Sequence, residues 1–278
     1  MADNTSIHRT SANKVHVIDL FCFKGAPTNQ DEDRAVQVLV NNGYVSGFSP
    51  DRLQPLWVAY RVAGADQDVD YDRPHLYYDD QRLDAEHRIS ANTFGKHNGV
   101  SYHVGHMAPN EVINRQFGRL AQMETFFMSN MSPQQGTLNT GVWLDLENKI
   151  RAIEDTRSKD HVWVFTGPIF SDSPETIERP GGQKVPIPSS YYSIVIDPFR
   201  YPWDRKSNVD IACFIIPQDA ERNTPLDDFL VNISDIENAT NLAFFPQWPQ
   251  PMAGLAPESQ EPNFGRGENR HRLIRQLY

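Results

Sequence analysis

Several residues of this chain are of types that could together form a metal site with a general base beside it. They are His103 and His106 in residues 102–110, Asn130 in residues 124–134, and Asn139, Glu147 and Arg151 in residues 138–151. A histidine can serve as a base because its ordinary pKa lies near neutral pH. Mg²⁺ takes oxygen ligands, keeps most of its waters and often binds only one or two protein groups, so one asparagine carbonyl near a carboxylate suits it.

The spacing of these residues also allows structural explanations. Asn139 and Glu147 are eight residues apart, which on one continuous helix places them about 80° apart around its axis. Glu147 and Arg151 form an i, i+4 pair that could hold each other in place, but such a surface pair is worth under about 1 kcal/mol. Asn139 could be the N-cap of its helix, and a single histidine in a glycine-containing turn is commonly structural. The residue types alone leave both interpretations open.

Three ordered motifs carry a more specific signal. They are Gly105–Pro109 (GHMAP), Ser129–Gln134 (SNMSPQ) and Asn139–Glu147 (NTGVWLDLE). Together they resemble the signature of the DNA/RNA non-specific endonucleases of the ββα-metal class. The similarity extends over about residues 40 to 246, where Trp57–Tyr60 resembles an early strand of that family and Thr166–Pro168 a later one.

The resemblance implies an α+β fold with a central, mostly antiparallel sheet flanked by helices, and a ββα-metal finger over about residues 95–157. It implies a sequence-non-specific endonuclease that hydrolyses DNA and/or RNA to products with 5′-phosphates. The expected cofactor is Mg²⁺, for which Mn²⁺ can substitute. The resemblance also leaves a homodimer open, because several members of the family dimerise.

The same resemblance assigns roles to four residues. His106 is the general base that takes a proton from the attacking water. Asn139 is the direct ligand of the metal, and Glu147 holds metal-bound waters, a usual role for outer partners of a metal site. Asn130 helps to position the site. The metal acts as a Lewis acid and template on the phosphate.

One departure from the family pattern concerns charge. Where the family has Asp-Arg before Gly-His, this chain has His103 and Val104. Valine cannot replace the fixed positive charge that an arginine offers to phosphate. That charge could come instead from Arg151, Arg115, Arg119 or a protonated His103, in which case Val104→Arg would raise cleavage only if the charge is still missing. The alternative is a degenerate site in a module that binds nucleic acid or a protein. Because the expected base, metal ligand and glutamate are all retained, we favour an active enzyme.

The overall charge excludes some classes of protein. The 278 residues carry 26 Lys and Arg against 36 Asp and Glu, a net charge of −10, which argues against a protein coated in basic charge for bulk nucleic-acid binding.

No stretch approaches the roughly 18 apolar residues of a membrane span, so we expect no membrane partner. No apolar signal segment follows the polar start of the chain. We therefore expect a cytoplasmic protein or one exported without a signal peptide. Cys22 and Cys213 lie in apolar runs and are expected to be buried thiols.

Hydrophobic patterning predicts the elements that position these residues. The predicted strands are Val15–Phe23, Leu56–Val62, His161–Thr166, Tyr191–Ile196 and Ile211–Ile216. The predicted helices are Asp31–Asn41, Asn110–Met123 and Thr137–Arg157, with a short one within Asp227–Asn238. Residues 64–99 are expected to be mostly loop. We expect a flexible lead over 1–14, one nuclease domain over 15–246, and a proline-rich wrap with a basic tail over 247–278.

Overall fold

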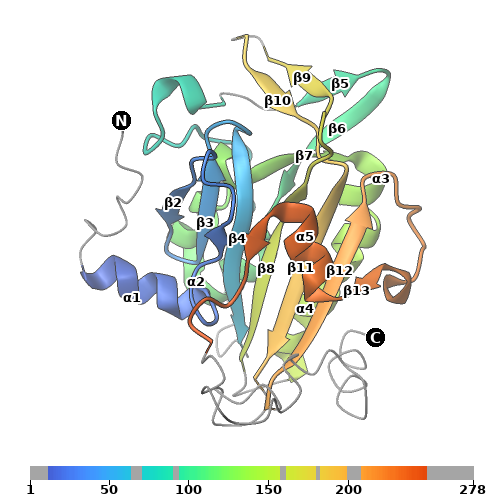
Figure 1. Cartoon of the computed structure of the whole chain (residues 1–278). Coiled ribbons are helices and arrows are strands. Elements are labelled where there is room, and N and C mark those ends of the chain that lie inside the picture. The colour runs from blue at the N-terminus through green and yellow to red at the C-terminus, as the bar shows by residue number, and fades with distance from the viewer. Residues whose placement is uncertain are drawn as a thin grey trace.

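A seven-stranded antiparallel sheet forms the centre of the fold (Figure 1). The structure is a computed structural model that describes residues 12–63, 71–89, 94–156, 161–179, 182–198 and 208–248. The helices are α1 (Ala12–Phe21), α2 (Asn110–Glu124), α3 (Gly136–Asn139), α4 (Val142–Thr156) and α5 (Ile233–Thr240), with 3₁₀ turns at Ala85–His87, Met128–Asn130 and Leu226–Phe229. The strands are β1 (Thr28–Asn29), β2 (Gln37–Val40), β3 (Tyr44–Ser49), β4 (Gln54–Ala63), β5 (Gly95–His97), β6 (Val100–His106), β7 (Met131–Gln135), β8 (His161–Ile169), β9 (Thr176–Glu178), β10 (Lys184–Pro186), β11 (Ser190–Asp197), β12 (Asp210–Pro217), β13 (Leu230–Val231) and β14 (Leu242–Ala243).

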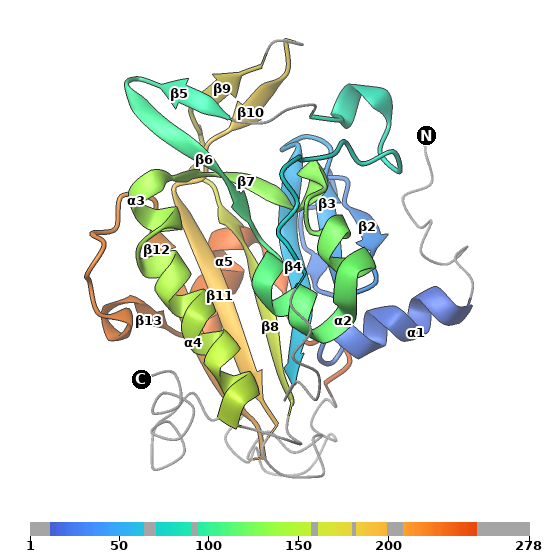
Figure 2. The same cartoon turned by 180° about the vertical axis from the view of Figure 1, so that it is seen from behind.

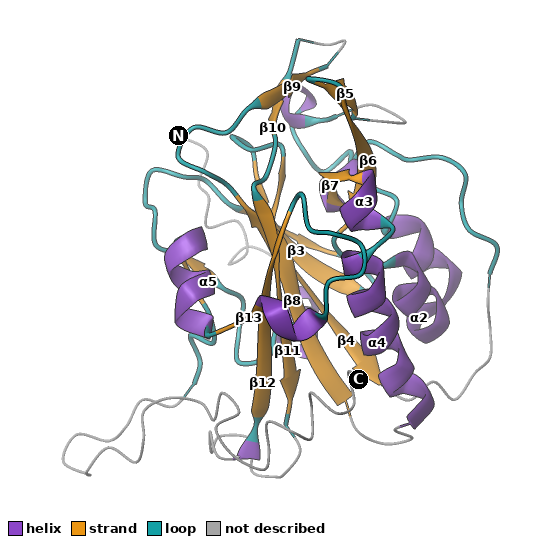
Figure 3. Ribbon diagram, turned by 90° about the vertical axis from the view of Figure 1, so that its right-hand side faces the viewer, coloured by secondary structure: helices purple, strands orange, loops and turns teal. Residues whose placement is uncertain are grey.

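The central sheet is buried on both faces. Its strand order is β13-β12-β11-β8-β4-β3-β2, and all its pairings are antiparallel. Figure 3 shows α5 on one side of the sheet and α2, α3 and α4 on the other, and Figure 2 shows α4 and α2 in front of the sheet. Alternate residues of β4 therefore enter different cores: Tyr60 packs on the α2–α4 side and Trp57 on the α5 side. The α+β prediction, with a mostly antiparallel sheet flanked by helices, is confirmed.

The predicted strand at Val15–Phe23 is wrong, because this segment is helical in α1. Its burial follows a helical period: Ile18, Phe21 and Cys22 enter the α5-side core, while His16 and Asp19 are exposed. Residues three and four apart share one face of a helix. The β-branched and aromatic composition misled the prediction, since tertiary packing overrides such weak propensities.

The predicted helix at Asp31–Asn41 is also wrong. Only a turn forms at Asp31–Arg34, and β2 follows at the edge of the central sheet, paired with β3. The Asn41 amide donates to the Tyr44 carbonyl at 2.9 Å, which closes a tight turn over Asn42 and Gly43. The Asn-Gly pair thus connects two antiparallel strands, as this dipeptide commonly does in a hairpin, and does not end a helix.

Most other predicted elements occur. The strands β4, β8, β11 and β12 contain the four other predicted strands, and α2 matches the predicted helix at Asn110–Met123. The predicted helix at Thr137–Arg157 is instead divided into α3 and α4. The division falls at Gly141, where a Cβ atom would lie 2.3 Å from the Thr137 carbonyl oxygen. Short helical segments at Leu226–Phe229 and α5 correspond to the one expected within Asp227–Asn238.

The predicted ββα finger consists of the small sheet β5-β6-β7 followed by α3 and α4. Figure 1 shows its strands at one end of the central sheet, beside the hairpin β9–β10. Val104 of β6 is buried in an apolar cluster with Met131 of β7, Ile177 of β9 and Val185 of β10. The two faces of β6 therefore have different surroundings, because successive side chains of a strand point to opposite sides.

The described chain begins with a helix and ends with a buried tryptophan. The lead predicted over 1–14 lies mostly outside the described residues, but α1 already begins at Ala12. The tail predicted over 247–278 begins with Gln247 and Trp248, and Trp248 is buried against Phe23 and Phe245. The rest of that tail lies outside the described residues.

Both cysteines are buried free thiols, as predicted. Among the described helices, none has the length and apolar character needed to cross a bilayer.

The position of Val104 leads to a stability prediction. Val104→Arg forces a charge into the apolar cluster, so we expect it to lower the free energy of unfolding by about 3 kcal/mol or more. Val100→Arg is the matched control, because Val100 lies on the same strand and is 37% exposed. Urea denaturation of both variants checks the expectation. Equal stabilities for the two would show that residue 104 does not face the cluster.

Candidate active site

The pairing of β6 with β7 brings two of the sequence motifs together. Gly105 lies opposite Ser132, and His106 lies opposite Met131. A Cβ atom on residue 105 would lie 2.1 Å from Oε1 of Gln134, so only glycine lets the two strands and the Gln134 side chain approach this closely. Gly105 thus fixes the course of the strand just before His106.

Asn130 holds the backbone just after His106. Its Oδ1 accepts a hydrogen bond from the Ala108 amide at 2.8 Å, and its Nδ2 donates to the carbonyls of Ala108 at 3.1 Å and Thr125 at 2.9 Å. The side chain is fully buried, and both of its amide hydrogens are used. Asn130 therefore positions the segment that carries His106 and does not reach toward a substrate.

His106 is held as a neutral ring. Its centroid lies 4.9 Å from that of Phe126 and 6.1 Å from that of Tyr77. Burial, and then the charge of Arg73, lower the pKa of His106 to about 3. Its Nε2 is buried and has no hydrogen-bond partner among the described residues. The imidazole is uncharged at neutral pH, so a ring nitrogen is available to accept a proton.

Among the described residues, Arg73 is the cation whose charge acts on both His106 and Glu147, and sequence reasoning missed it. Its guanidinium lies over the Phe126 ring at 5.2 Å from the centroid, on the same side chain that contacts His106. Its charge lowers the pKa values of both His106 and Glu147. Arg73 belongs to the polar stretch 64–99, outside the three motifs, and no spacing links it to His106. Only the folded chain brings the two together.

Helix α2 anchors the segment that carries Arg73. Asn114 and Gln122 each donate a side-chain hydrogen bond to the Tyr71 carbonyl at 3.1 Å. Arg119 donates to the Asp72 carbonyl at 2.5 Å and to Oε1 of Gln122 at 2.7 Å. Arg119, predicted as a direct source of charge, thus holds the backbone immediately before Arg73.

Glu147 of α4 is a partly buried carboxyl group. Its Oε1 accepts a hydrogen bond from Nε1 of Trp143 at 3.0 Å. Burial raises the pKa of Glu147 to about 7, although the Trp143 hydrogen bond and the charges of Arg73 and Arg151 act in the opposite direction. This carboxyl therefore gains or loses its proton near neutral pH.

The possible i, i+4 pairing of Glu147 with Arg151 does not occur. Arg151 forms an ion pair with Glu111 of α2, with Nη1 3.2 Å from Oε1, and donates to Oδ1 of Asn148 at 3.2 Å. Its charge still acts on Glu147, but its ion pair with Glu111 connects α4 to α2. Arg115 is a partly buried residue of α2, and the cations that shift the pKa values of His106 and Glu147 are Arg73 and Arg151.

Asn139 and His103 face each other across α3. Nδ2 of Asn139 lies 3.2 Å from Nδ1 of His103. Asn139 is the last residue of α3 and not the N-cap of a long helix, so the 80° relation to Glu147 on one continuous helix does not apply. Val104, the other residue of the departure, points to the apolar cluster. An arginine side chain at position 104 would therefore enter that cluster and would not supply positive charge to the candidate site.

The donor atoms of this region suit a hard cation. Oδ1 of Asn139 has no hydrogen-bond partner among the described residues, and Glu147 adds carboxylate oxygens on the next helix. In the described part of the chain, no group of three or more His, Cys, Asp or Glu residues has the arrangement of a metal site. An amide oxygen at the end of α3 and a carboxylate on α4 are donors of the kind that a Mg²⁺ ion uses when it keeps most of its waters.

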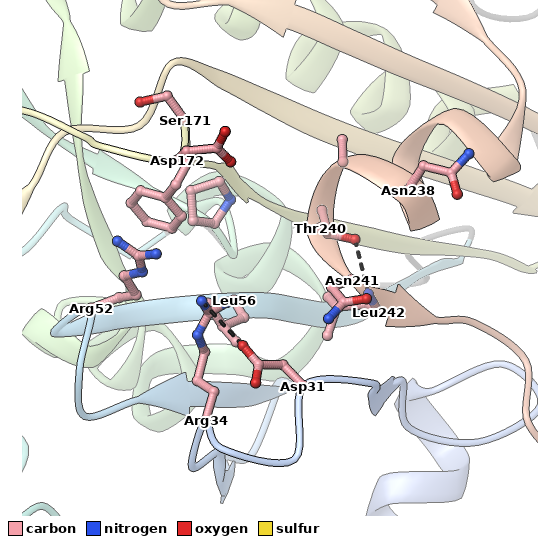
Figure 4. Close-up of a pocket in the computed structure, with 13 residues that line it drawn as sticks. Asp31, Arg34, Arg52, Leu56, Ser171, Asp172, Asn238, Thr240, Asn241 and Leu242 are labelled. Atoms are coloured by element: carbon pink, nitrogen blue, oxygen red, sulfur yellow. Dashed lines mark hydrogen bonds and ion pairs between the residues drawn. The ribbon is translucent and has the colours of Figure 1, made fainter.

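A separate pocket of about 320 Å³ lies on the α5 side of the sheet (Figure 4). In it, the Arg52 guanidinium stacks on Phe170 at 4.8 Å from the ring centroid, and Arg34 pairs with Asp31 at 3.4 Å. The residues at the end of α5 form another wall. None of the predicted site residues lines this pocket.

The raised pKa of Glu147 predicts how stability depends on pH. The ordinary pKa of its carboxyl is about 4.5, against about 7 in the folded protein. The folded state holds the proton more tightly than the unfolded chain, so the free energy of unfolding falls as pH rises through this window. Glu147→Gln removes the effect. Relative to wild type, it should gain about 1 to 3 kcal/mol between pH 4.5 and pH 8.

Urea denaturation in EDTA at the two pH values measures this difference. Glu178→Gln is the control, because Glu178 is exposed at the end of β9 and should give no such gain. A stability difference between Glu147→Gln and wild type that is the same at both pH values would contradict the prediction.

Comparison with known proteins gives the family. Residues 24–250 match the family model of the DNA/RNA non-specific endonucleases. Human mitochondrial endonuclease G is 27% identical over 219 residues, which cover 76% of this chain and 70% of that protein. Nuclease C1 of Cunninghamella echinulata var. echinulata is 33% identical over 162 residues, which cover 55% of this chain and 60% of that protein.

A solved structure confirms the fold. The crystal structure of the EndoG/EndoGI complex contains a chain that superposes with a TM-score of 0.65 at 24% identity, covering 86% of this chain and 94% of that one. This chain has the ββα-metal nuclease fold and belongs to the DNA/RNA non-specific endonucleases, a family of metal-dependent enzymes that hydrolyse phosphodiester bonds.

Proposed function

We propose that this protein is a Mg²⁺-dependent endonuclease that cuts DNA and/or RNA without sequence preference and leaves 5′-phosphates, with His106 as the general base. One observation carries the proposal: a neutral histidine whose Nε2 has no partner among the described residues lies beside a positioned arginine, Arg73. The first can accept a proton and the second can bind phosphate, so both parts of a phosphodiester hydrolysis are present.

The base becomes stronger when substrate binds. In the free protein burial lowers the pKa of His106 most, and the positive charge of Arg73 lowers it further. A phosphodiester that binds Arg73 offsets this charge and so raises the pKa of the imidazole. His106 then takes the proton of the attacking water more readily, and the water oxygen attacks the phosphorus. The P–O3′ bond breaks, and the 3′-oxygen departs with the electron pair of that bond and takes a proton from solvent water. The phosphate remains on the 5′-oxygen.

Arg73 replaces the charge that Val104 cannot supply. A guanidinium can form two parallel hydrogen bonds to phosphate oxygens, and a fixed cation stabilises the extra negative charge of the transition state. The alternative of an inactive binding module depended on the absence of this charge. Because Arg73 is anchored by α2 beside His106, we favour the active enzyme over that alternative.

Two residues would hold the metal ion. Asn139 would supply its Oδ1 as the direct protein ligand, and the carboxylate of Glu147 would accept hydrogen bonds from waters of the ion. When bound, Mg²⁺ or Mn²⁺ supplies Lewis-acid stabilisation of the phosphate and of the departing 3′-oxygen. The ionised form of Glu147 is the one that can accept these hydrogen bonds, and a nearby cation favours it.

Removal of the base should show directly in catalysis. His106→Ala should lower the rate of plasmid cleavage by about 10² or more, the usual scale for a positioned general base. Cleavage by the wild type should require Mg²⁺ and stop with EDTA, and its products should be ligated without prior phosphorylation. A wild type that cuts equally well in EDTA, or whose ends need phosphorylation before ligation, would contradict the proposal.

Arg73 should affect the chemical step more than folding. Arg73→Ala removes the charge next to the phosphate and should lower kcat by about 10² or more, with little change in unfolding because its side chain is exposed. Arg73→Lys should recover part of the loss, since it restores charge without the planar fork. Arg34→Ala, on the α5 side of the sheet, is the matched control for lost positive charge. Equal rates for Arg73→Ala and Arg34→Ala would remove Arg73 from the mechanism.

A further inference from the structure

The imidazole of His103 spans the single turn of α3. At one end of the ring, Nδ1 lies 3.2 Å from Nδ2 of Asn139. At the other end, Nε2 is so close to Gly136 that a Cβ atom there would lie 2.9 Å from it. The first and last residues of α3 therefore both contact one side chain of β6.

The hydrogen bond has a defined direction. Nδ2 of Asn139 carries only hydrogens and can only donate, so Nδ1 of His103 is the acceptor and the ring proton is on Nε2. This contact fixes which end of the amide faces His103. Oδ1 of Asn139 points away from the ring, where it has no hydrogen-bond partner among the described residues. If the amide turned over, an N–H group would take the place of the oxygen, and an N–H group cannot bind a cation.

We infer that His103 is a positioning residue for the metal site: it holds the Asn139 amide in the orientation that presents Oδ1 to the cation. The inference rests on the proposed function, in which Asn139 is the metal ligand. It also explains the departure at residue 103. An aspartate at this position would offer an acceptor oxygen, and the histidine offers Nδ1, so the acceptor is kept although its chemistry differs.

Gly136 is the second part of this arrangement. Alanine fits an α-helix better than glycine does, so Gly136→Ala should not disrupt α3. Its methyl group would instead meet Nε2 and Cε1 of His103 at 2.9 and 3.1 Å. The imidazole must then shift away from its place over the helix. This substitution disturbs the contact without changing either of the two side chains that form it.

The test measures Mn²⁺ binding by the whole protein without substrate, using electron paramagnetic resonance to follow the free ion. His103→Ala should weaken binding by about 10-fold or more, as loss of an outer partner of a metal ligand commonly does. His103→Asp can only accept hydrogen bonds and should keep binding within a few-fold of wild type. Gly136→Ala should weaken binding as His103→Ala does, and the double variant should be no worse than either single one.

Two substitutions serve as matched controls. His97→Phe removes a histidine from the neighbouring strand β5, where it contacts Glu175 and not the site. Thr137→Ala changes an exposed residue of α3 itself. Both should bind Mn²⁺ as the wild type does. Thermal unfolding of every variant shows whether the fold is kept.

An Asn139→Ala background separates the inference from the proposed function. There, His103→Ala should have no further effect on Mn²⁺ binding, because the histidine acts through the amide. If Asn139→Ala weakens binding but His103→Ala does not, the inference is wrong and the proposed metal ligand stands. If His103→Ala still weakens binding in the Asn139→Ala background, the inference is also wrong. If Asn139→Ala leaves binding unchanged, the proposed metal site itself is wrong, and the inference with it.

Discussion

The register between β6 and β7 is the constraint on which the site depends. Because side chains alternate along a strand, this register sends Val104 into the apolar cluster and leaves its neighbours on the other face. A slip by one residue would exchange the two faces, bury His103 in that cluster, and turn Val104 and His106 to the other face. The close approach of Gly105 to Gln134 and the hydrogen bonds of Asn130 to Ala108 prevent such a slip. The motifs that contain Gly105 and Asn130 therefore fix a single register between β6 and β7, and this register brings them together.

The positive charge near His106 comes from Arg73, which the fold brings to the site, and not from a residue of β6 itself. The strand offers an apolar side chain at Val104, while Arg73 reaches His106 from a separate segment that α2 anchors. The same helix takes up Arg151 through Glu111. Helix α2 therefore affects both arginines. It holds the backbone before Arg73, which lies beside His106, and its Glu111 binds Arg151, which connects α2 with α4.

The sequence can propose those parts of the candidate site that stand in ordered motifs. His106, Asn130, Asn139 and Glu147 are candidates because three such motifs contain them, and the β-branched composition predicts the buried strands of the central sheet. Arg73 could not be found, because its relation to His106 exists only in the folded chain. The Glu147–Arg151 pair failed because Glu111 competes for the arginine. The segments Val15–Phe23 and Asp31–Asn41 failed because packing and a tight turn outweighed local propensity.

Burial acts on His106 and Glu147 in opposite senses, since it lowers the pKa of the imidazole and raises that of the carboxyl. In both cases it favours the uncharged form. The free site therefore keeps a neutral base and a carboxyl that is partly protonated near neutral pH. Under the proposed function, a phosphate offsets the charge of Arg73 and a cation favours the ionised form of Glu147. The phosphate would thus raise the pKa of His106, and the cation would lower the pKa of Glu147. A phosphate on Arg73 also removes part of the charge that favours the ionised form of Glu147, so the cation must supply that stabilisation. Because the phosphate is an anion and the metal a cation, the two should bind better together than apart.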